Sequence, residues 1–488
     1  MQPRVDRFVE TARKEMKSEL SQTFLGLFSS RFPLMRRAAL SSFPDPAAAE
    51  AYARAIRADV LERLPELLEK FEKKATACGV EVCWARDAAE ANDIILGIAR
   101  QRGVHYVTKG KSMITEEIGL NEHLVANGVD VYETDLGEMI TQQLSLPPFH
   151  LVGPAMNVPP EKISDIFMKK GILKEPTIDP VTLGKAARTF LREKFKTQEM
   201  GIVGVNMAVA ETGTFINVEN EGNIRMNKSA PKTLVAIMSL EKVVPTLADA
   251  LHMVRILIRN CTGQKMTSYV SFDTGPKKAR ELDGPEKIFM VIVDNGRSAI
   301  YKDFETRGIL KCIRCGACMN TCPVYGKIGG YPYGFAYTGP MGQAITPLLL
   351  GLEKTSDLYR ACTLCGSCAQ TCPAGVDHPS LFLTYRSREI KMKTKGSGRL
   401  PRARDALATL SSSVMRHGWA WGLGVKCARP VLNFFSRDGC IGSIPLGARG
   451  WFFYRDLMAV PGKSFREMWK DLANRSVPST DSDRKEAL

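Results

Sequence analysis

Two nearly identical cysteine motifs constrain this chain more than any other feature of its sequence. CIRCGACMNTCPVYG spans residues 312–326, and CTLCGSCAQTCPAGV spans residues 362–376. Each contains Cys-x2-Cys-x2-Cys-x3-Cys-Pro, which is the spacing of bacterial two-cluster ferredoxins. There, three closely spaced thiolates bind one iron–sulfur cluster and the fourth cysteine binds the other. The spacing therefore predicts two [4Fe-4S] clusters with crossed ligands.

The crossed arrangement assigns four cysteines to each cluster. One cluster is expected to bind Cys312, Cys315, Cys318 and Cys372, and the other Cys362, Cys365, Cys368 and Cys322. Pro323 and Pro373 disfavour helical geometry at the cysteines before them, so those cysteines can turn away from their own motif. Gly316 and Gly366 are predicted to lie where the backbone passes close to cluster sulfide without a Cβ atom.

Zinc is the alternative metal for these motifs. Structural zinc sites usually pair Cys-x2-Cys knuckles across a dozen or more residues, which differs from three cysteines at steps of three. We therefore favour iron–sulfur clusters. Because a cysteine is available for every ligand position, the clusters are expected to carry single electrons rather than to act on a substrate. The remaining cysteines are interpreted as small buried apolar residues; they are Cys78, Cys83, Cys261, Cys427 and Cys440.

Composition and charge indicate a basic, globular, cytoplasmic protein. The chain has 488 residues, of which 44% are apolar, and a net charge of +15, so it is long enough for about three domains. Its N-terminus lacks the apolar stretch of a secretion signal, and no run of eighteen apolar residues occurs. Any membrane contact is therefore expected to be peripheral, at the inner face of the cell membrane. In a reducing cytoplasm, clustered cysteines indicate metal binding rather than disulfides.

Hydrophobic periodicity divides the chain into four parts. Residues 1–75 are predicted to form amphipathic helices, and residues 76–300 an α/β domain with a mostly parallel sheet. Residues 301–390 are expected to form an α-helical ferredoxin-like domain, and residues 391–488 a basic, aromatic region that ends in a disordered tail. Strands of the sheet are expected at VEVCWA, VHYVTKG, VDVYETDL, FHLVGPAM, TLVAIMSL and KIFMVIVDN.

A polar ligand site is expected in the α/β domain, because parallel sheets bind ligands at the carboxyl ends of their strands. The segment SMITEEIGLNEHLVANG is predicted to be one helix capped by Ser112. The polar residues nearby have an alternative interpretation as ordinary turn and cap residues. No Gly-x-Gly-x-x-Gly follows a strand, so bound flavin or nicotinamide is not expected. The candidate site residues are Lys109, Lys111, Glu116, Asn121, Glu133, Asp135, Glu211, Thr212, Asn220, Glu221 and Asn223.

Several segments, taken in order, resemble a known family. TKGKSMITEEIGLNEHL, ETGTFINVENEGN, CIRCGACMNTCPVY and WFFYRDLMAVPGKSFREMWK are similar to the iron–sulfur B subunit of bacterial L-lactate utilisation complexes. The resemblance implies a three-component complex that oxidises L-lactate to pyruvate, in which this subunit passes electrons through its clusters toward the respiratory chain. The implied partners are a cysteine-rich redox subunit and a second α/β subunit. It also implies an α/β fold like that of sugar-phosphate isomerases and CoA transferases.

Three positions depart from the pattern of that family. Histidine is usual where this chain has Asn157, Thr233 and Tyr331. Because histidines carry protons and bind metals near neutral pH, their replacement leaves open another 2-hydroxy acid or another dehydrogenase as the electron donor. A redox or ligand sensor that uses the same clusters is a further alternative. Whether the chain is itself catalytic or only carries electrons stays open.

The basic C-terminal region has three interpretations. Residues 386–404 contain eight Lys or Arg and a single Glu. Basic residues beside aromatic ones suit an anionic membrane surface. A partner subunit is favoured, because electrons must leave the clusters into something close by. Nucleic acid is not expected, since no aromatic residue interrupts the basic run. The aromatic residues that follow are Trp419, Trp421, Phe434, Phe435, Trp451, Phe452, Phe453 and Tyr454.

Overall fold

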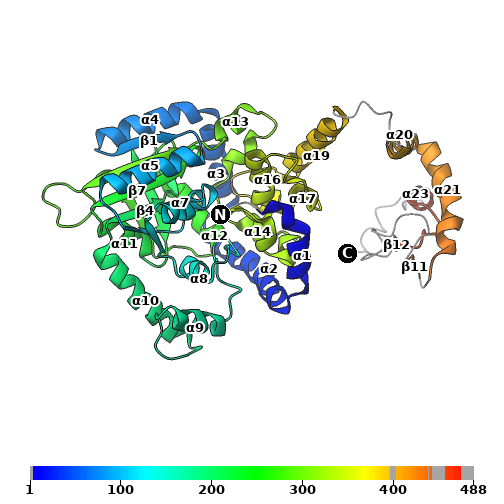
Figure 1. Cartoon of the computed structure of the whole chain (residues 1–488). Helices are drawn as coiled ribbons and strands as arrows, with labels where there is room; N and C mark the ends of the chain where they lie inside the picture. The colour runs from blue at the N-terminus through cyan, green and yellow to red at the C-terminus, as the bar shows by residue number, and fades with distance from the viewer. Residues whose placement is uncertain (1–3, 396–402, 438, 442–456, 474–488) are drawn as a thin grey trace, which may run out of the picture. The chain divides into compact units, whose positions relative to one another are not determined.

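A six-stranded parallel sheet forms the centre of the larger of two compact units. The computed structural model describes residues 4–395, 403–437, 439–441 and 457–473 (Figure 1), and the chain forms two compact units, Met1–Lys393 and Thr394–Leu488. The sheet belongs to the first unit and has the order β1-β10-β7-β4-β2-β3, which confirms the predicted α/β fold. Its strands are β1 (Glu81–Ala85), β2 (Tyr106–Lys109), β3 (Asp130–Glu133), β4 (Met200–Gly204), β7 (Thr233–Ser239) and β10 (Lys287–Val293).

Both faces of this sheet are covered, which explains the continuous apolar runs of its central strands. Every residue of β7 is buried, and its side chains alternate between the two faces. One face packs against three helices, which are α5 (Ala88–Gln101), α6 (Met113–Glu117) and α7 (Leu120–Ala126). The opposite face packs against α3 (Pro46–Glu62), α4 (Leu64–Ala77) and α12 (Leu247–Cys261). Two of the predicted N-terminal helices therefore contribute to the core of the α/β domain.

A second, smaller sheet extends this core. It has the order β8-β5-β6-β9, in which β6 pairs antiparallel with both neighbours. Its strands are β5 (Met207–Val209), β6 (Thr214–Glu219), β8 (Val243–Val244) and β9 (Tyr269–Asp273). Short α11 (Asn223–Ser229) follows β6. A separate small core forms around α8 (Leu136–Leu144), α9 (Pro160–Lys169) and α10 (Pro180–Thr197).

The two cysteine motifs lie in a helical part of the same unit, and the segment between them is helical as predicted. Its elements are α13 (Arg297–Lys302), η3 (Arg307–Lys311), α14 (Ala317–Asn320), α15 (Tyr325–Ile328), η4 (Tyr331–Tyr333), α16 (Gly339–Leu350), α17 (Ser356–Arg360), α18 (Ser367–Thr371) and α19 (His378–Lys395). The N-terminal helices α1 (Phe8–Lys17) and α2 (Glu19–Leu40) pack here, α1 against η4 and α15 and α2 against α14 and α15 (Figure 1). Phe8 meets Tyr333 edge to face, with ring centroids 5.7 Å apart.

Two local predictions are wrong. FHLVGPAM forms no strand, because residues 149–156 make a turn in which the Phe149 amide donates to the Pro154 carbonyl at 2.9 Å. The single helix predicted after β2 is divided into α6 and α7 at Gly119, whose φ is +66°. Ser112 precedes α6 at its N-cap position, but its side chain makes no capping hydrogen bond.

The second unit contains three described helices and a pair of short antiparallel strands. They are α20 (Ala403–Arg416), α21 (Gly418–Phe434), α23 (Phe465–Ala473) and the pair β11 (Cys440–Ile441) and β12 (Leu457–Met458). Trp419, Trp421 and Phe434 on α21 are exposed and Phe435 is half-buried. The other predicted aromatic residues, 451–454, and the predicted tail from residue 476 lie outside the described residues. None of the described helices is both long and apolar enough to cross a membrane.

Candidate functional site

The two cysteine motifs share one backbone conformation. Arg314 and Leu364, at equivalent positions between the first two cysteines, have φ values of +61° and +57°. Gly316 and Gly366, directly after the second cysteine, have φ values of +75° and +80°. Glycine adopts this left-handed conformation without strain. This explains why both motifs have glycine at this position. Repetition of two left-handed residues at matching positions shows that each motif turns in the same way.

Backbone amides point at the first thiol of each motif. The amide of Arg314 donates to Cys312 Sγ at 3.4 Å, and that of Leu364 donates to Cys362 Sγ at 3.3 Å. Amide donors of this kind stabilise the thiolate form that metal binding requires. Both motifs therefore place a backbone amide donor against the sulfur of their first cysteine.

The fourth cysteine of each motif receives similar hydrogen bonds. Cys322 Sγ accepts from the Tyr325 amide at 3.4 Å, and Cys372 Sγ accepts from the Val376 amide at 3.3 Å. Each donor lies after the proline that follows the fourth cysteine. The prolines thus stand at the point where the backbone changes direction.

Electrostatic interactions join each fourth cysteine to the other motif. Burial raises the pKa of Cys315, and the charge of Cys372 is the next contribution. Burial likewise raises the pKa of Cys368 to about 12, with Cys322 as the next contribution. The charge of each fourth cysteine thus acts on a thiol of the other motif, and the crossed assignment of ligands stays a prediction.

The donor set suits two iron–sulfur clusters. Of the eight motif cysteines, Cys315, Cys318, Cys368 and Cys372 are buried, and amide donors face four of the sulfurs. Among the residues that the structure describes, no group of three His, Cys, Asp or Glu side chains is close enough to hold one metal ion. Cys365 is exposed and hydrogen bonding to Ser367 lowers its pKa, so the second motif reaches the surface.

The prediction for the other cysteines is wrong in three cases. Cys78, Cys427 and Cys440 are exposed, whereas Cys83 and Cys261 are half-buried. Cys78 lies just past the end of α4, α21 buries no residue around Cys427, and only the second residue of β11 is buried. In each case the apolar core ends before the cysteine.

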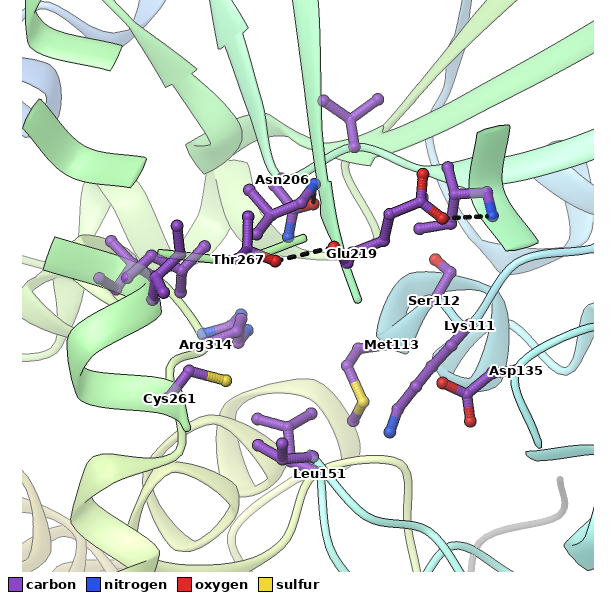
Figure 2. Close-up of a pocket in the computed structure, with 18 of the residues that line it drawn as sticks. Lys111, Ser112, Met113, Asp135, Leu151, Asn206, Glu219, Cys261, Thr267 and Arg314 are labelled. Atoms are coloured by element: carbon purple, nitrogen blue, oxygen red, sulfur yellow. Dashed lines mark hydrogen bonds between the residues drawn. The ribbon is translucent and has the colours of Figure 1, made fainter. Parts of the chain in front are cut away.

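A cavity of about 290 Å³ lies between the α/β domain and the first cysteine motif (Figure 2). Its walls come from the carboxyl ends of β2, β3, β4 and β7, from the second sheet and from α12. The loop of the first motif closes it with Ile313 and Arg314. The cavity is therefore at the sheet edge where open α/β folds bind ligands.

The structure divides the predicted ligand residues into three groups. Lys111, Asp135, Asn220, Glu221 and Asn223 line the cavity. Lys109, Glu116, Asn121 and Glu133 instead form a polar cluster outside the cavity lining, in which Lys109 Nζ lies 2.7 Å from Glu133 Oε1 and 3.1 Å from Glu116 Oε1. Glu211 and Thr212 also lie away from the cavity, where they hydrogen-bond the Leu247 amide and the Thr214 hydroxyl.

Sequence reasoning missed several cavity residues that come from distant segments. Arg314 and Lys242 are the cations among them, and Tyr337 and Cys261 complete the wall near the first motif. Burial lowers the pKa of Lys242 to about 8. Arg314 had one signal in the sequence, because a charged residue stands where the second motif has Leu364. The others have no local signal, since only tertiary folding brings them together.

A chain of buried ion pairs connects the first motif to the α/β domain. Arg314 Nη2 lies 2.9 Å from Glu241 Oε1, and Arg297 Nε lies 3.0 Å from Glu241 Oε2. Arg297 also pairs with Glu117 at 2.6 Å. Although burial favours the neutral acid, the charges of Arg297 and Arg314 lower the pKa of Glu241 to about 2. The loop beside the first predicted cluster is thus held to the sheet by charged groups.

Three departures from the resembling family can now be placed. Asn157 and Tyr331 hydrogen-bond each other, with the Asn157 Nδ2 donating to the Tyr331 hydroxyl at 3.1 Å. Thr233 is buried at the start of β7. None of the three lines the cavity, so these replacements do not alter its wall.

Comparisons with known proteins agree with this organisation. A model of the LUD domain matches residues 68–293, and a model of the 4Fe-4S dicluster domain matches residues 308–376. Lactate utilization protein B of Geobacillus thermodenitrificans is 39% identical over 87% of this chain and 88% of its own length. The same-named protein of Macrococcus caseolyticus is 36% identical over 96% and 98%. Uncharacterized electron transport protein YkgF of Escherichia coli is 39% identical over 85% and 86%.

Proposed function

This chain belongs to the lactate utilization protein B family, and from that membership we propose that it carries electrons through iron–sulfur clusters in lactate utilisation. The observation that carries the proposal is the pair of matching motifs, whose eight thiols fall within the segment matched by the dicluster model. Their spacing and the amide hydrogen bonds to sulfur fit two [4Fe-4S] clusters. No open ligand position is left for substrate chemistry at the metal.

The overall reaction of the assembled complex is the oxidation of L-lactate, or a related 2-hydroxy acid, to the 2-oxo acid. The hydroxyl-bearing carbon gives up two electrons, and two protons are released to solvent. Two [4Fe-4S] clusters held by the eight motif cysteines would carry these electrons one at a time toward a quinone-linked acceptor of the respiratory chain. The partners are a cysteine-rich redox subunit and a second α/β subunit, at the inner face of the cell membrane.

An order of electron flow follows from the surroundings of the two motifs. Each motif has two buried thiols, but only the first motif contributes the loop between its first two cysteines to the wall of the cavity. The second motif has the exposed Cys365. Electron transfer between proteins needs a short path between centres, so the first cluster receives electrons and the second delivers them to a partner that covers Cys365.

Iron analysis and electron paramagnetic resonance of anaerobically purified protein test the cofactor content. We expect about eight irons per chain and, on reduction, the interacting signals of two [4Fe-4S] clusters. Fewer than about four irons in protein that is otherwise folded, or zinc in their place, would contradict the proposal.

Adding a 2-hydroxy acid to the complex tests the reaction. With the co-purifying subunits present, L-lactate should bleach the visible absorbance of the clusters, and the isolated chain should bleach slowly or not at all. A complex that holds both clusters but is reduced by no 2-hydroxy acid would exclude this function.

A further inference from the structure

We propose that the cavity beside the first cysteine motif binds a small organic acid, and that Arg314 is the residue that holds the carboxylate of this ligand. The identity of the acid, a 2-hydroxy or 2-oxo acid, rests on the proposed function. The existence of the site does not, because it follows from the arrangement of charged and polar groups around the cavity.

Arg314 has an unused hydrogen-bond donor at the cavity. Its side chain is only 6% exposed, and Nη2 pairs with Glu241 Oε1 at 2.9 Å. Nη1 is buried and has no hydrogen-bond partner in the part of the chain that the structure describes. A buried guanidinium donor without a partner is costly. A carboxylate is the group that best satisfies it, because the hydrogen bond is then charge-assisted.

A second cation lies near the same end of the cavity. Lys242 lines the wall, and the charge of Arg314 acts on its amino group. Ser239 and Thr262 also contribute to the lining. Arg314 and Lys242 attract a carboxylate to this wall. Because Glu241 already neutralises part of the charge of Arg314, the two cations balance a single such group.

The opposite end of the cavity carries more acidic than basic groups, although Lys111 Nζ is also buried there without a hydrogen-bond partner among the described residues. Asp135 and Glu221 line it together with Lys111, and Figure 2 shows Lys111 and Asp135 across the cavity from Arg314. Glu221 accepts a hydrogen bond from the Leu136 amide at 3.1 Å, and Asp135 accepts one from the Glu138 amide at 3.1 Å. These carboxylates repel a second anionic group, but they accept a hydrogen bond from a hydroxyl. The cavity therefore favours a ligand with a carboxylate at one end and a neutral polar group at the other.

The size of the cavity supports a small ligand. Its volume of about 290 Å³ is at the lower end of the range for ligand pockets. Among the described residues, the lining offers no glycine-rich loop to bind the phosphates of a dinucleotide. The carboxylates of the wall would also repel these phosphates. A three-carbon acid such as lactate does not fill the cavity. The remaining volume can hold the longer side chain of a larger 2-hydroxy acid.

The backbone of Arg314 connects this site to the first predicted cluster. The amide of Arg314 donates to Cys312 Sγ at 3.4 Å, while the guanidinium of the same residue faces the cavity. An anion bound to the guanidinium brings negative charge close to the cluster. Binding should therefore change the signal of the first cluster and leave that of the second nearly unaltered.

The test uses the full-length protein with its clusters, purified anaerobically. Isothermal titration calorimetry measures the binding of L-lactate, L-2-hydroxybutyrate and L-2-hydroxyisocaproate, each compared with its neutral amide. We expect at least one acid to bind ten times or more tighter than its amide. Electron paramagnetic resonance of the partly reduced protein should show a ligand-dependent shift in one cluster signal. If no acid binds more tightly than its own amide, the proposal is overturned.

Variants locate the binding. Arg314→Gln should weaken acid binding by about tenfold to a hundredfold, since a charge-assisted hydrogen bond is lost. Arg360→Gln is the matched control, because this arginine lies two residues before the second motif, pairs with Glu389 and is absent from the cavity wall. It should bind the acid as the unaltered protein does. An Arg314→Gln protein that keeps its clusters and full affinity would overturn the proposal.

Two further variants decide the matter if Arg314→Gln does not fold. Val152→Trp fills the cavity from a loop at its wall, and Lys242→Gln removes the second cation. Both should weaken acid binding at least tenfold, and unchanged binding in both would place the ligand elsewhere. Acid binding can be measured without turnover, so the experiments distinguish failure of the site from failure of the proposed function. Acid binding without reduction by the assembled complex would refute the proposed function alone, and reduction without binding to this chain would refute the site alone.

Discussion

The guanidinium of Arg297 and the carboxylate of Glu117 form a fully buried, bidentate ion pair. Nη1 and Nη2 of the arginine donate to Oε1 and Oε2 at 2.8 and 2.6 Å, and neither side chain has any exposed surface. Tyr337, from the segment between the motifs, donates its hydroxyl to the same carboxylate. One charged group thus joins α6 of the α/β domain, α13 and the cysteine-rich part of the chain.

Removing one partner of this pair should be strongly destabilising. Glu117→Gln leaves the buried Arg297 charge with less compensation, and the expected loss in the free energy of unfolding is about 3–5 kcal/mol. Chemical denaturation monitored by circular dichroism measures it. The exposed pair of Lys287 and Glu81, at 2.8 Å, serves as the control, and Glu81→Gln should cost less than about 1 kcal/mol. Equal effects for the two substitutions would contradict the importance of burial.

Crossed ligation makes a specific prediction for the fourth cysteines. Cys372→Ser should damage the cluster held by the first motif, and Cys322→Ser the cluster held by the second. In each variant we expect loss or conversion of one cluster, with iron falling toward about four per chain, while the signal of the other cluster persists. Iron analysis together with electron paramagnetic resonance distinguishes the two.

The control for this experiment is an exposed cysteine outside the motifs. Cys427→Ser alters a thiol on α21 and should leave the iron content unchanged. If Cys372→Ser removed only the signal of the second motif, each motif would bind its own fourth cysteine and the crossed assignment would be wrong.

The sheet was predictable because its strands carry their own signal. β7 and β10 are apolar along nearly their whole length, as strands buried on both faces must be. FHLVGPAM also contains a short apolar run but makes a turn. Phe149 is fully buried against Tyr331, with ring centroids 5.1 Å apart, so its apolar character serves a contact with the cysteine-rich part. Local periodicity cannot distinguish these two uses of an apolar run.

The candidate site was predictable only in part, for a related reason. The strand-end rule selected Lys111 and Asp135, which do line the cavity, because the carboxyl ends of parallel strands share one edge. It also selected Lys109, which faces Glu133 and takes part in a buried cluster instead. Spacing along one strand does not say which polar residue faces the cavity. Arg314 lies far from the strands in sequence, and only the contact between the two domains brings it to the wall.

Close packing around β4 makes Gly201 sensitive to substitution. A Cβ atom at this position would lie 1.8 Å from the carbonyl oxygen of Asn227, which is backbone and cannot move without displacing α11. We expect Gly201→Ala to reduce the free energy of unfolding by about 1–3 kcal/mol or more. Gly97→Ala is the control, since nothing lies within 4 Å of its Cβ position in α5, and it should stabilise by about 0.5–1 kcal/mol. Thermal unfolding compares the two variants.

His150 should make stability depend on pH below neutrality. It is 2% exposed, its Nε2 lies 3.1 Å from Asn320 Oδ1, and burial lowers its pKa from 6.5 to about 4. Because His150 binds a proton more readily in the unfolded state, the contribution of neutral, buried His150 to the free energy of unfolding is fully present above pH 6.5. It is lost as the pH falls toward 4, by about 3 kcal/mol at 1.36 kcal/mol per pKa unit. Urea denaturation between pH 7.5 and 4.5 should show a steeper decline for the unaltered protein than for His150→Gln. Parallel curves for the two proteins would mean that His150 has the same pKa in the folded and unfolded states.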